Sequence, residues 1–334
     1  MLRAPITRVL PPTPEALAEA AACLQAGEVV AFPTETVYGL GGNALDARAV
    51  ARIFQAKERP ADNPLIVHVP DLQAVSGFAH FDERAVRLAA ALWPGPLSLV
   101  LPRRLEVALP AAAGLSTVAV RVPAHPVALA LVRAAGVPVA APSANRSGRP
   151  SPTTAAHVEH DLGGRIPLIL DGGACEVGIE STVLALFDDR PRILRPGGVS
   201  AEAIAQVLGE PVGTELGSHH SPGTRHPHYR PKSPVILLGW ELSDAALAQL
   251  HTQLAPTVGR ICTRTHPAAP HRFRADAAAL ARHLYADLRA LDGAPCLVVE
   301  GLPGAPPVME RVARAASQVV TDEAGLAALA RSFA

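Results

Sequence analysis

Residues 57–68 have the sequence Lys-Glu-Arg-Pro-Ala-Asp-Asn-Pro-Leu-Ile-Val-His, which predicts a helix end, a loop and then a strand. The two prolines cannot continue a helix, and each favours an extended conformation in the residue before it. The apolar run from Leu65 to Val69 predicts the strand. Lys57 and Arg59 are therefore expected on a loop at the edge of a sheet, where a point charge and a fork of donors suit polyphosphate. An isolated Lys-x-Arg is more typical of a solvated charge pair, and that alternative stays open at this point.

The composition predicts a globular protein with more than one domain. Its 334 residues are about twice the length of a typical domain. The sequence is 49% hydrophobic and 18% charged, which provides apolar cores and excludes a disordered composition. Thirty Lys and Arg balance 30 Asp and Glu, so the formal net charge is +0. Because nucleic-acid-binding proteins usually carry a basic excess, this balance disfavours RNA or DNA as the main partner.

Cysteine usage and apolar runs favour a cytoplasmic protein. The four cysteines are far apart and form no C-x-x-C pair, which fits a reducing compartment and indicates no zinc ribbon. The N-terminus has no apolar core of signal-peptide length. The longest apolar stretch, 88–101, is interrupted by two prolines and is too short to span a bilayer.

Periodicity, capping residues and turn signals predict a first domain over residues 1–209. Its expected helices are 13–25, one that begins at Asp46, 71–78, 82–92, 125–135, one that begins at Thr153, and 200–208. Its expected strands are 28–32, 65–69, 97–101, 117–122, 137–141, 168–171, 181–186 and 192–195. Helices and strands mix without strict alternation, so we expect an α/β fold with a twisted mixed sheet.

Residues 210–233 predict a linker, because they are dense in Gly, Pro, Ser and His and have no period. Four histidines lie in it, and four histidines so close together can bind zinc. No nearby cysteine or regular spacing supports zinc, so a solvated linker is favoured. The histidines are His219, His220, His226 and His228.

After the linker, expected strands and helices alternate regularly. This alternation predicts a smaller, Rossmann-like parallel α/β domain over residues 234–334. Its expected strands are 234–238, 258–262 and 296–300. Its expected helices are 243–254, 275–291, 307–316 and 322–330.

Two loops of the first domain are rich in hydroxyl groups. Residues 33–41 place Thr34 and Thr36 just past a strand, where open α/β sheets bind ligands. Residues 141–153, Ala-Pro-Ser-Ala-Asn-Arg-Ser-Gly-Arg-Pro-Ser-Pro-Thr, suit hydrogen bonds to a nucleotide. Each is also compatible with an ordinary turn-rich loop. No G-x-x-x-x-G-K-[ST] loop occurs and no G-x-G-x-x-G follows a strand, which disfavours a P-loop kinase and a dinucleotide dehydrogenase.

Three further polar residues lie on or beside expected strands. Arg121 is either a strand-end arginine that reaches solvent or a buried fork for a carboxylate, and the sequence leaves both open. A histidine on a strand, such as His68, is more often structural than a ligand contact. Ser181 is outside any G-x-S-x-G elbow, as is Ser143, so a serine hydrolase is not supported.

Four separated motifs, in order, resemble the long form of the threonylcarbamoyl-AMP synthases. They are Pro33-Thr-Glu-Thr-Val-Tyr-Gly-Leu-Gly, Lys57-x-Arg-Pro-x-x-Asn-Pro-Leu, Ala141-Pro-Ser-Ala-Asn-x-Ser-Gly and Ser221-Pro-Gly-x-Arg-x-x-His-Tyr. The resemblance covers nearly the whole chain and implies a YrdC-like catalytic domain, a linker and a C-terminal α/β domain. It departs at Pro306-Pro-Val-Met-Glu310-Arg311, where the family tends to show a Gly-Ala-Ile…Asn-Arg pattern.

The resemblance implies a nucleotidyltransferase that makes threonylcarbamoyl-AMP and pyrophosphate from L-threonine, bicarbonate and ATP, for N6-threonylcarbamoyladenosine in tRNA. It implies Lys57 and Arg59 as catalytic residues. The implied ATP-binding residues are Lys57, Arg59, Asn63, Thr117, Ser143, Asn145, Ser151, Arg195 and, as part of a linker lid, Tyr229. The implied threonine-binding residues are Thr36, His68, Arg121, Ala141 and Ser181.

The resemblance also implies Mg²⁺ held mainly by ATP phosphates, no metal-binding side chains, downstream tRNA threonylcarbamoyltransferase proteins as partners, and at most weak contact with tRNA. Two other functions are considered. A non-catalytic RNA-binding module is disfavoured by the zero net charge. A carbamoyl transferase of the hydrogenase-maturation type shares the domain but adds an acylphosphatase-like domain and zinc-finger cysteines, which this sequence does not contain.

Overall fold

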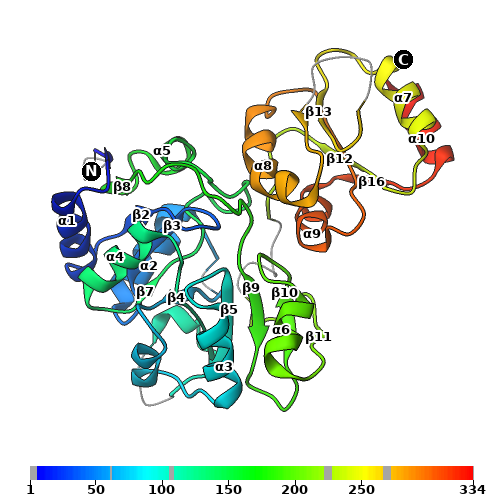
Figure 1. Cartoon of the computed structure of the whole chain (residues 1–334). Helices are drawn as coiled ribbons and strands as arrows, with labels where there is room; N and C mark the ends of the chain where they lie inside the picture. The colour runs from blue at the N-terminus through cyan, green and yellow to red at the C-terminus, as the bar shows by residue number, and fades with distance from the viewer. Residues whose placement is uncertain (1–5, 61, 105–108, 222–227, 266–271, 334) are drawn as a thin grey trace. The chain divides into compact units, whose positions relative to one another are not determined.

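The structure is a computed structural model that describes residues 6–60, 62–104, 109–221, 228–265 and 272–333. The chain separates into two compact units, drawn together in Figure 1. The N-terminal unit contains Met1–Ser147 and Ser151–His226, and the C-terminal unit contains Gly148–Pro150 and Pro227–Ala334. The main division falls inside the predicted linker.

The N-terminal unit is built on a sheet with both parallel and antiparallel strand pairs, as predicted. Its strand order is β1-β8-β2-β3-β7-β4-β6-β5-β9-β10-β11. The strands are β1 Arg8–Leu10, β2 Val30–Phe32, β3 Gly39–Asn43, β4 Ile66–His68, β5 Leu97–Pro102, β6 Thr117–Arg121, β7 Val139–Ala140, β8 Leu168–Leu170, β9 Thr182–Ala185, β10 Arg192–Arg195 and β11 Gly213–Thr214.

Capping side chains fix where the helices of this unit begin. Thr13, Asp46, Asp82, Thr154 and Ser200 each accept a hydrogen bond from a backbone N–H in the first turn. The helices are α1 Pro14–Gln25, α2 Ala47–Lys57, η1 Gln73–Gly77, α3 Glu83–Leu92, η2 Pro110–Ala112, α4 Pro126–Ala135, α5 Ala155–Leu162 and α6 Ala201–Leu208, where η is a 3-10 helix.

Helices cover both faces of the sheet. α1 and α4 pack together over β2 and β8 on one face, through a cluster rich in alanine and leucine. α2, α3, α5 and α6 contribute to a larger apolar cluster on the other face. A small third cluster, with Ile66, Val100, Ala119 and Val183, lies on alternate positions of β4, β5, β6 and β9. Because side chains alternate across a strand, these four residues face away from the large cluster.

Three expectations for the N-terminal unit and the linker are corrected. Residues 39–41 were expected in a loop, but Gly39–Asn43 form β3, which pairs antiparallel with β2. The helix expected over 71–78 is a short 3-10 helix, Gln73–Gly77. The solvated linker is wrong for His228, which is buried, whereas His219 is exposed and His226 lies outside the described residues. Two short strands, β1 and β11, were not expected, and β11 lies in the linker.

The C-terminal unit is a five-stranded sheet in which every pair is parallel, as predicted. Its strand order is β14-β13-β15-β12-β16. α7 packs with α10 and α8 packs with α9. The elements are β12 Val235–Leu238, α7 Asp244–Gln253, β13 Gly259–Cys262, β14 Arg272–Phe273, α8 Ala277–Ala290, β15 Leu297–Glu300, α9 Pro306–Ala315, β16 Gln318–Val320 and α10 Glu323–Ser332. Strands β14 and β16 were not expected.

Among the described residues, none of the helices has both the length and the apolar character needed to cross a bilayer.

Candidate active site

Polar side chains interrupt the apolar face that carries Ile66, Val100 and Ala119. His68 lies two residues after Ile66 on β4, Ser98 two before Val100 on β5, and Thr117 and Arg121 two on either side of Ala119 on β6. Alternation along a strand puts each of them on the same face as its apolar neighbour. All four are buried. The central strands therefore present a polar site on one face.

Arg121 is the centre of this site. Its Nη2 pairs with Glu35 Oε1 at 2.6 Å, its Nη1 donates to Thr36 Oγ1 at 3.0 Å, and its Nε donates to the Gly95 carbonyl at 3.1 Å. Only 3% of Arg121 is exposed, so it does not reach solvent. Of the two possibilities that the sequence left open, the buried fork is correct. Its carboxylate partner is Glu35 of the same chain.

The charge of Arg121 affects two neighbouring pKa values. Burial acts to raise the pKa of Glu35, but the charge and hydrogen bond of Arg121 outweigh it, so the pKa is lowered. His68 is opposite Arg121 in the parallel pairing of β4 with β6. Burial, assisted by Arg121, lowers the pKa of His68 to about 3. The site therefore contains a carboxylate, a guanidinium and a neutral imidazole at neutral pH.

Thr36 is held by its own loop. Its Oγ1 is 2.7 Å from Thr34 Oγ1, and Thr34 Oγ1 also donates to the Val37 carbonyl. These bonds make a tight hydroxyl turn directly after β2, and the turn sets the position of the hydroxyl that meets Arg121.

Ser181 lies at the start of β9 beside two partners. Its Oγ is 2.8 Å from Ser98 Oγ and accepts a hydrogen bond from Arg195 Nη2 at 3.1 Å. Arg195 also donates to the Ser181 carbonyl at 3.0 Å and is itself buried. One predicted threonine contact and one predicted ATP contact are thus in direct contact with each other.

Lys57 is the last residue of α2 and is 1% exposed. Its Nζ donates to the carbonyls of Ser143 and Asn145, at 2.5 Å each. Ser143 Oγ donates to Asn145 Oδ1 at 2.6 Å. The residue after Lys57, Glu58, ends the helix in the left-handed conformation. The structure therefore brings together three of the predicted ATP contacts, and Lys57 is no solvated surface charge.

The remaining loop residues lie close by along the chain. Arg59 is partly buried and its Nη2 donates to the Pro64 carbonyl at 3.3 Å. Asn63 is 1% exposed. The Ala141 amide donates to the Ile66 carbonyl at 2.9 Å, which joins the strand before the Ser143 loop to β4. The loop after β7 thus lies beside the start of β4, whereas His68 and Arg121 lie at the opposite ends of β4 and β6.

Two other predicted ATP contacts have partners that were not predicted. Ser151 Oγ donates to Glu180 Oε1 at 2.6 Å, and both are buried. Thr117 Oγ1 is 2.8 Å from Nδ1 of His220, a residue of the predicted linker. The linker therefore reaches β6 within the N-terminal unit.

Tyr229 falls in the C-terminal unit, and its ring contacts come from residues of that unit. Its ring stacks on Tyr285 of α8 with centroids 5.3 Å apart, and the Arg311 guanidinium lies 5.9 Å from its centroid. Its φ is 67°, a left-handed conformation that is uncommon outside glycine.

Three polar residues of this site were not predicted from the sequence: Glu35, Ser98 and Glu180. Glu35 lies inside a motif whose threonines were singled out, and Glu180 precedes Ser181 directly. Ser98 carries no signal, because a serine in an apolar strand is ordinary. The partner of each is distant in the sequence, so only the fold identifies them.

One group with metal-ligand chemistry occurs among the described residues, in the C-terminal unit. His251, Cys262 and Glu300 place one ligand atom each within 4.8 Å of one another. His251 Nε2 is already 2.7 Å from Glu300 Oε1, and Glu300 Oε2 accepts from the Thr263 and Arg264 amides. These contacts account for the cluster as a buried hydrogen-bonded pair with a neighbouring thiol.

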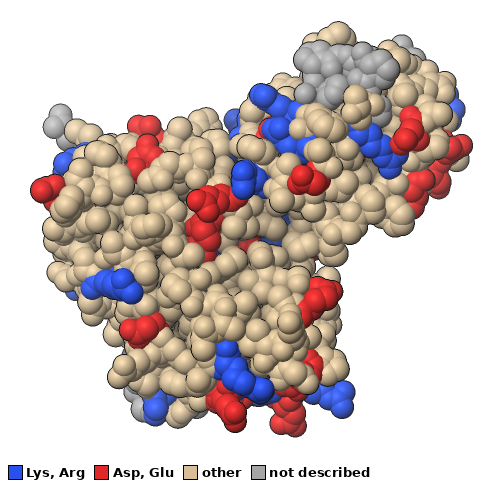
Figure 2. All heavy atoms as spheres, viewed as in Figure 1, with Lys and Arg blue, Asp and Glu red and all other residues tan. Residues whose placement is uncertain are grey.

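The surface carries charges of both signs. On the face of the N-terminal unit that Figure 2 shows, the basic side chains are few and lie among acidic ones. That face offers no continuous basic area of the kind that tracks a nucleic-acid backbone. This agrees with the formal net charge of +0.

An α/β sheet that carries a buried guanidinium, a neutral imidazole and an anchored lysine suits the binding of small anionic ligands. Residues 22–197 match the family model of Sua5, YciO and YrdC, described as "Telomere recombination". Residues 199–317 match the model described as the C-terminal domain of threonylcarbamoyl-AMP synthase.

Relatives and a solved structure agree with these matches. The threonylcarbamoyl-AMP synthase of Bacillus subtilis is 52% identical over 231 residues, which are 66% of this chain and 66% of that protein. The enzyme of that name from Schizosaccharomyces pombe is 40% identical and covers 94% of this chain and 92% of its own. The crystal structure of Pyrococcus abyssi Sua5 complexed with L-threonine gives a TM-score of 0.86 at 39% identity, over 95% of this chain and 99% of that one.

The chain belongs to the threonylcarbamoyl-AMP synthase family. It is therefore an enzyme of the nucleotidyltransferase type, and the family expected from the motifs is confirmed. The near full-length match leaves neither an RNA-binding module nor a hydrogenase-maturation carbamoyl transferase favoured.

Proposed function

We propose that the chain converts L-threonine, bicarbonate and ATP into threonylcarbamoyl-AMP, pyrophosphate and water. The observation that carries the proposal is the buried Arg121, held by Glu35 and Thr36 on the same sheet face as Thr117. An amino-acid carboxylate fits the guanidinium, and the anchored Ser143 loop beside the start of β4 supplies a site for a nucleotide. The likeness to a protein crystallised with L-threonine supports the amino acid.

Threonine binding follows from the donors of Arg121. A guanidinium has five N–H donors, and the contacts to Glu35, Thr36 and Gly95 use three of them. The other donors can bind the substrate carboxylate without breaking these contacts. The hydroxyls of Thr36 and Ser181, with neutral His68 and the backbone at Ala141, would then contact the rest of the amino acid. Glu35 acts as a positioning residue, since it fixes the fork and limits the net positive charge around it.

The chemistry requires two steps. The neutral amine of threonine attacks bicarbonate, or CO₂ derived from it, and water is lost as the carbamate forms. A carbamate oxygen then attacks the α-phosphorus of ATP, and the bond to the β-phosphate oxygen breaks as pyrophosphate leaves. No group of the protein forms a covalent bond. Catalysis therefore depends on positioning and on charge stabilisation.

Lys57 and Arg59 are the proposed catalytic residues. Lys57 holds the Ser143 loop against the end of α2 and puts a positive charge beside the backbone that would receive the phosphates. Arg59 adds a guanidinium on the loop that follows α2. Both charges oppose the negative charge that grows on the leaving pyrophosphate. Asn63, Asn145, Ser151 and Arg195, with Thr117, complete the proposed nucleotide set.

We also propose that Mg²⁺ enters with ATP, bound by phosphate oxygens and water. Of the carboxylates that the structure puts at this site, Glu35 pairs with Arg121 and Glu180 accepts from Ser151. They are therefore committed to other partners, and a protein-built Mg²⁺ cage does not fit these residues. The ion would neutralise phosphate charge when it is bound.

Tyr229 and the linker would close over the nucleotide and exclude water from a hydrolysable product. The left-handed backbone at Tyr229 supports a functional role, because such conformations cluster at sites that move or bind. The product would pass to separate tRNA threonylcarbamoyltransferase proteins in the cytoplasm, where tRNA, ATP and bicarbonate occur together.

The test is pyrophosphate release by the full chain with each substrate left out in turn. We expect release only when ATP, threonine and bicarbonate are all present. Release from ATP that is indifferent to threonine would refute the proposal. Lys57→Ala and Arg59→Ala should nearly abolish the complete reaction.

A further inference from the structure

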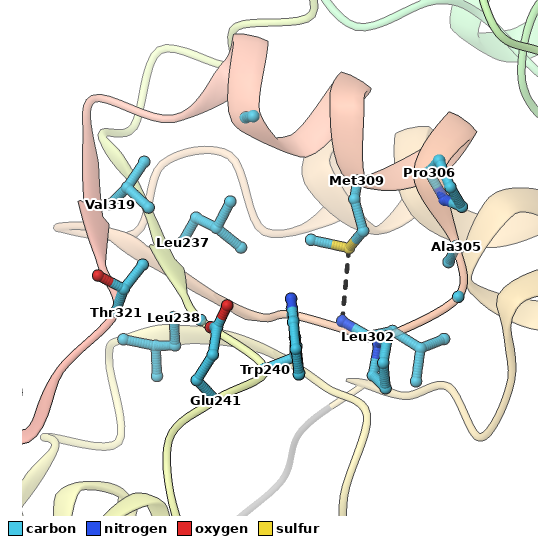
Figure 3. Close-up of a pocket in the computed structure, with 15 residues that line it drawn as sticks. Leu237, Leu238, Trp240, Glu241, Leu302, Ala305, Pro306, Met309, Val319 and Thr321 are labelled. Carbon is cyan, nitrogen blue, oxygen red and sulfur yellow. Dashed lines mark hydrogen bonds between the residues drawn. The ribbon is translucent and has the colours of Figure 1, made fainter.

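A cavity of about 500 Å³ lies at the carboxyl edge of the C-terminal sheet. It is lined by the ends of β12 and β16, by the loop after β15 and by α9 (Figure 3). β12 and β15 are neighbours in the sheet. The connection that follows β12 leads towards the β13 side of the sheet, whereas the connection that follows β15 leads towards the β16 side. Open α/β sheets bind ligands where neighbouring connections part in this way. The volume is also in the range of small-molecule sites.

The lining determines what charge a ligand can have. Among the 15 residues that line the cavity, the only charged side chain is Glu241, and the only hydroxyl is that of Thr321. No lysine or arginine is in the lining to balance a phosphate. α9 begins with Pro306 and Pro307 and has no side-chain cap. Because proline has no N–H, the first turn of this helix is a poor anion site. The lining therefore disfavours an anion and suits a ligand that donates a hydrogen bond to Glu241.

The apolar part of the lining includes an exposed aromatic ring. Trp240 is 52% exposed and Val319 is 53% exposed, which is high for such large apolar side chains. The Met309 thioether points from α9 towards the loops that carry Trp240 and Leu302, and it accepts a hydrogen bond from the Leu302 amide at 3.5 Å (Figure 3). An indole and a thioether together suit a planar aromatic ligand.

The Trp240–Glu241 segment is held in place by the rest of the unit. Arg264 Nη2 donates to the Trp240 carbonyl at 2.7 Å, while its Nη1 pairs with Asp244 at 2.9 Å. Glu241 Oε2 lies 2.5 Å from where a β-carbon on Gly239 would be, so this glycine lets the carboxylate fold over the strand end. The ring and the carboxylate are thus neighbouring parts of one preformed surface.

We propose that this cavity binds an unphosphorylated nucleoside whose base carries an amino group, such as adenosine or cytidine. The base stacks on Trp240 and its amino group donates to Glu241. A nucleotide is rejected, because its phosphate would meet a carboxylate and find no cation. The site is separate from the proposed catalytic residues of the N-terminal unit and does not depend on their assignment.

The test is isothermal titration calorimetry of the full chain with adenosine, cytidine, uridine and AMP. Saturating threonine and a non-hydrolysable ATP analogue fill the catalytic site, so that heat reports the second site. We expect adenosine and cytidine to bind. Uridine, which has no amino group, and AMP should each bind roughly tenfold more weakly. Glu241→Gln should bring AMP closer to adenosine, since it removes the repelling charge.

Three further variants locate the site. Trp240→Ala removes the stacking ring, and Ala313→Phe fills the cavity from an exposed position on α9. Each should weaken adenosine binding roughly tenfold or more. Ala328→Phe makes the same change at an exposed position on α10, outside the lining, and should leave binding intact. The proposal is overturned if neither amino-bearing nucleoside binds, if AMP binds as tightly as adenosine, or if Trp240→Ala and Ala313→Phe both bind adenosine normally. Pyrophosphate release by Trp240→Ala reports the catalytic proposal separately.

Discussion

Arg121 Nη2 lies 2.6 Å from Glu35 Oε1, and their side chains are 4% and 9% exposed. A buried ion pair of this kind is electrically neutral as a unit, but either partner left alone is a buried, uncompensated charge. The pair therefore fixes the position of the guanidinium. The same guanidinium is the proposed receptor for the threonine carboxylate.

Replacement of Glu35 should separate its structural and functional effects. Glu35→Ala should lower the free energy of unfolding by about 3 kcal/mol or more, because Arg121 loses its buried counter-charge. It should also raise KM for threonine roughly tenfold or more, because the fork is no longer held. Glu35→Gln should raise KM less, since its amide oxygen can still accept from Nη2. Urea denaturation and steady-state kinetics measure both effects. A matching rise in KM for ATP would show that Glu35 does not act through the amino-acid site.

Lys57 offers a test with a matched control. The sequence contains two lysines, Lys57 and Lys232, and Lys232 is exposed. Lys57→Met keeps most of the side-chain volume but removes the donor to the Ser143 and Asn145 carbonyls. We expect kcat to fall about a hundredfold to a thousandfold. Lys232→Met should leave kcat unchanged. Equal activities for the two variants would contradict the catalytic role of Lys57.

His68 should make folding stability depend on pH. Burial lowers its pKa from 6.5 to about 3. The unfolded chain therefore binds a proton at a pH where the folded chain does not, and stability falls as the pH drops below 6.5. We expect His68 to cost about 2 kcal/mol between pH 7.5 and pH 5.

Urea unfolding of the protein and of His68→Asn over this pH range measures the effect. The variant should lose less stability on acidification. His125, whose pKa burial also lowers, is present in both proteins and cancels in the comparison. If the free energy of unfolding changes equally with pH in the two proteins, the imidazole is not neutral when buried.

The contact of His220 with Thr117 predicts competition with ATP. Nδ1 of His220 lies 2.8 Å from the hydroxyl that is proposed to contact the nucleotide. His220→Ala should therefore lower KM for ATP about threefold to tenfold, because that bond no longer has to break. His80→Ala, at an exposed position, serves as the control. An unchanged KM in His220→Ala would show that the contact does not compete with ATP, and a higher KM would show that the linker histidine supports nucleotide binding.

The sequence predicted the fold class and most of the element positions, because caps and apolar periods are local signals. Thr13 and Asp46 begin helices as expected. Strand β3 was hidden, since its glycines have low strand propensity. A β-carbon on Gly41 would lie 2.7 Å from the Phe32 ring and 2.8 Å from Val139. The strand needs glycine for close packing, and that requirement is visible only in three dimensions.

The candidate site residues were predicted from sequence motifs. Which of these residues contact one another was not predicted. From the sequence alone, the Arg121 side chain could either reach solvent or be buried and bind a carboxylate. The fold decides it, because residue 121 faces inward beside Glu35, 86 positions away. Long-range pairs of this kind have no local signature, which is also why Ser98 and Glu180 were missed.

We propose that the chain makes a carbamate of threonine before it uses ATP. The most direct measurement is mass spectrometry of the product formed from ATP, threonine and ¹³C-labelled bicarbonate. We predict an adenylate of threonylcarbamate that carries the label, formed in step with pyrophosphate. An unlabelled threonyl-adenylate, or pyrophosphate without a labelled adduct, would contradict the account.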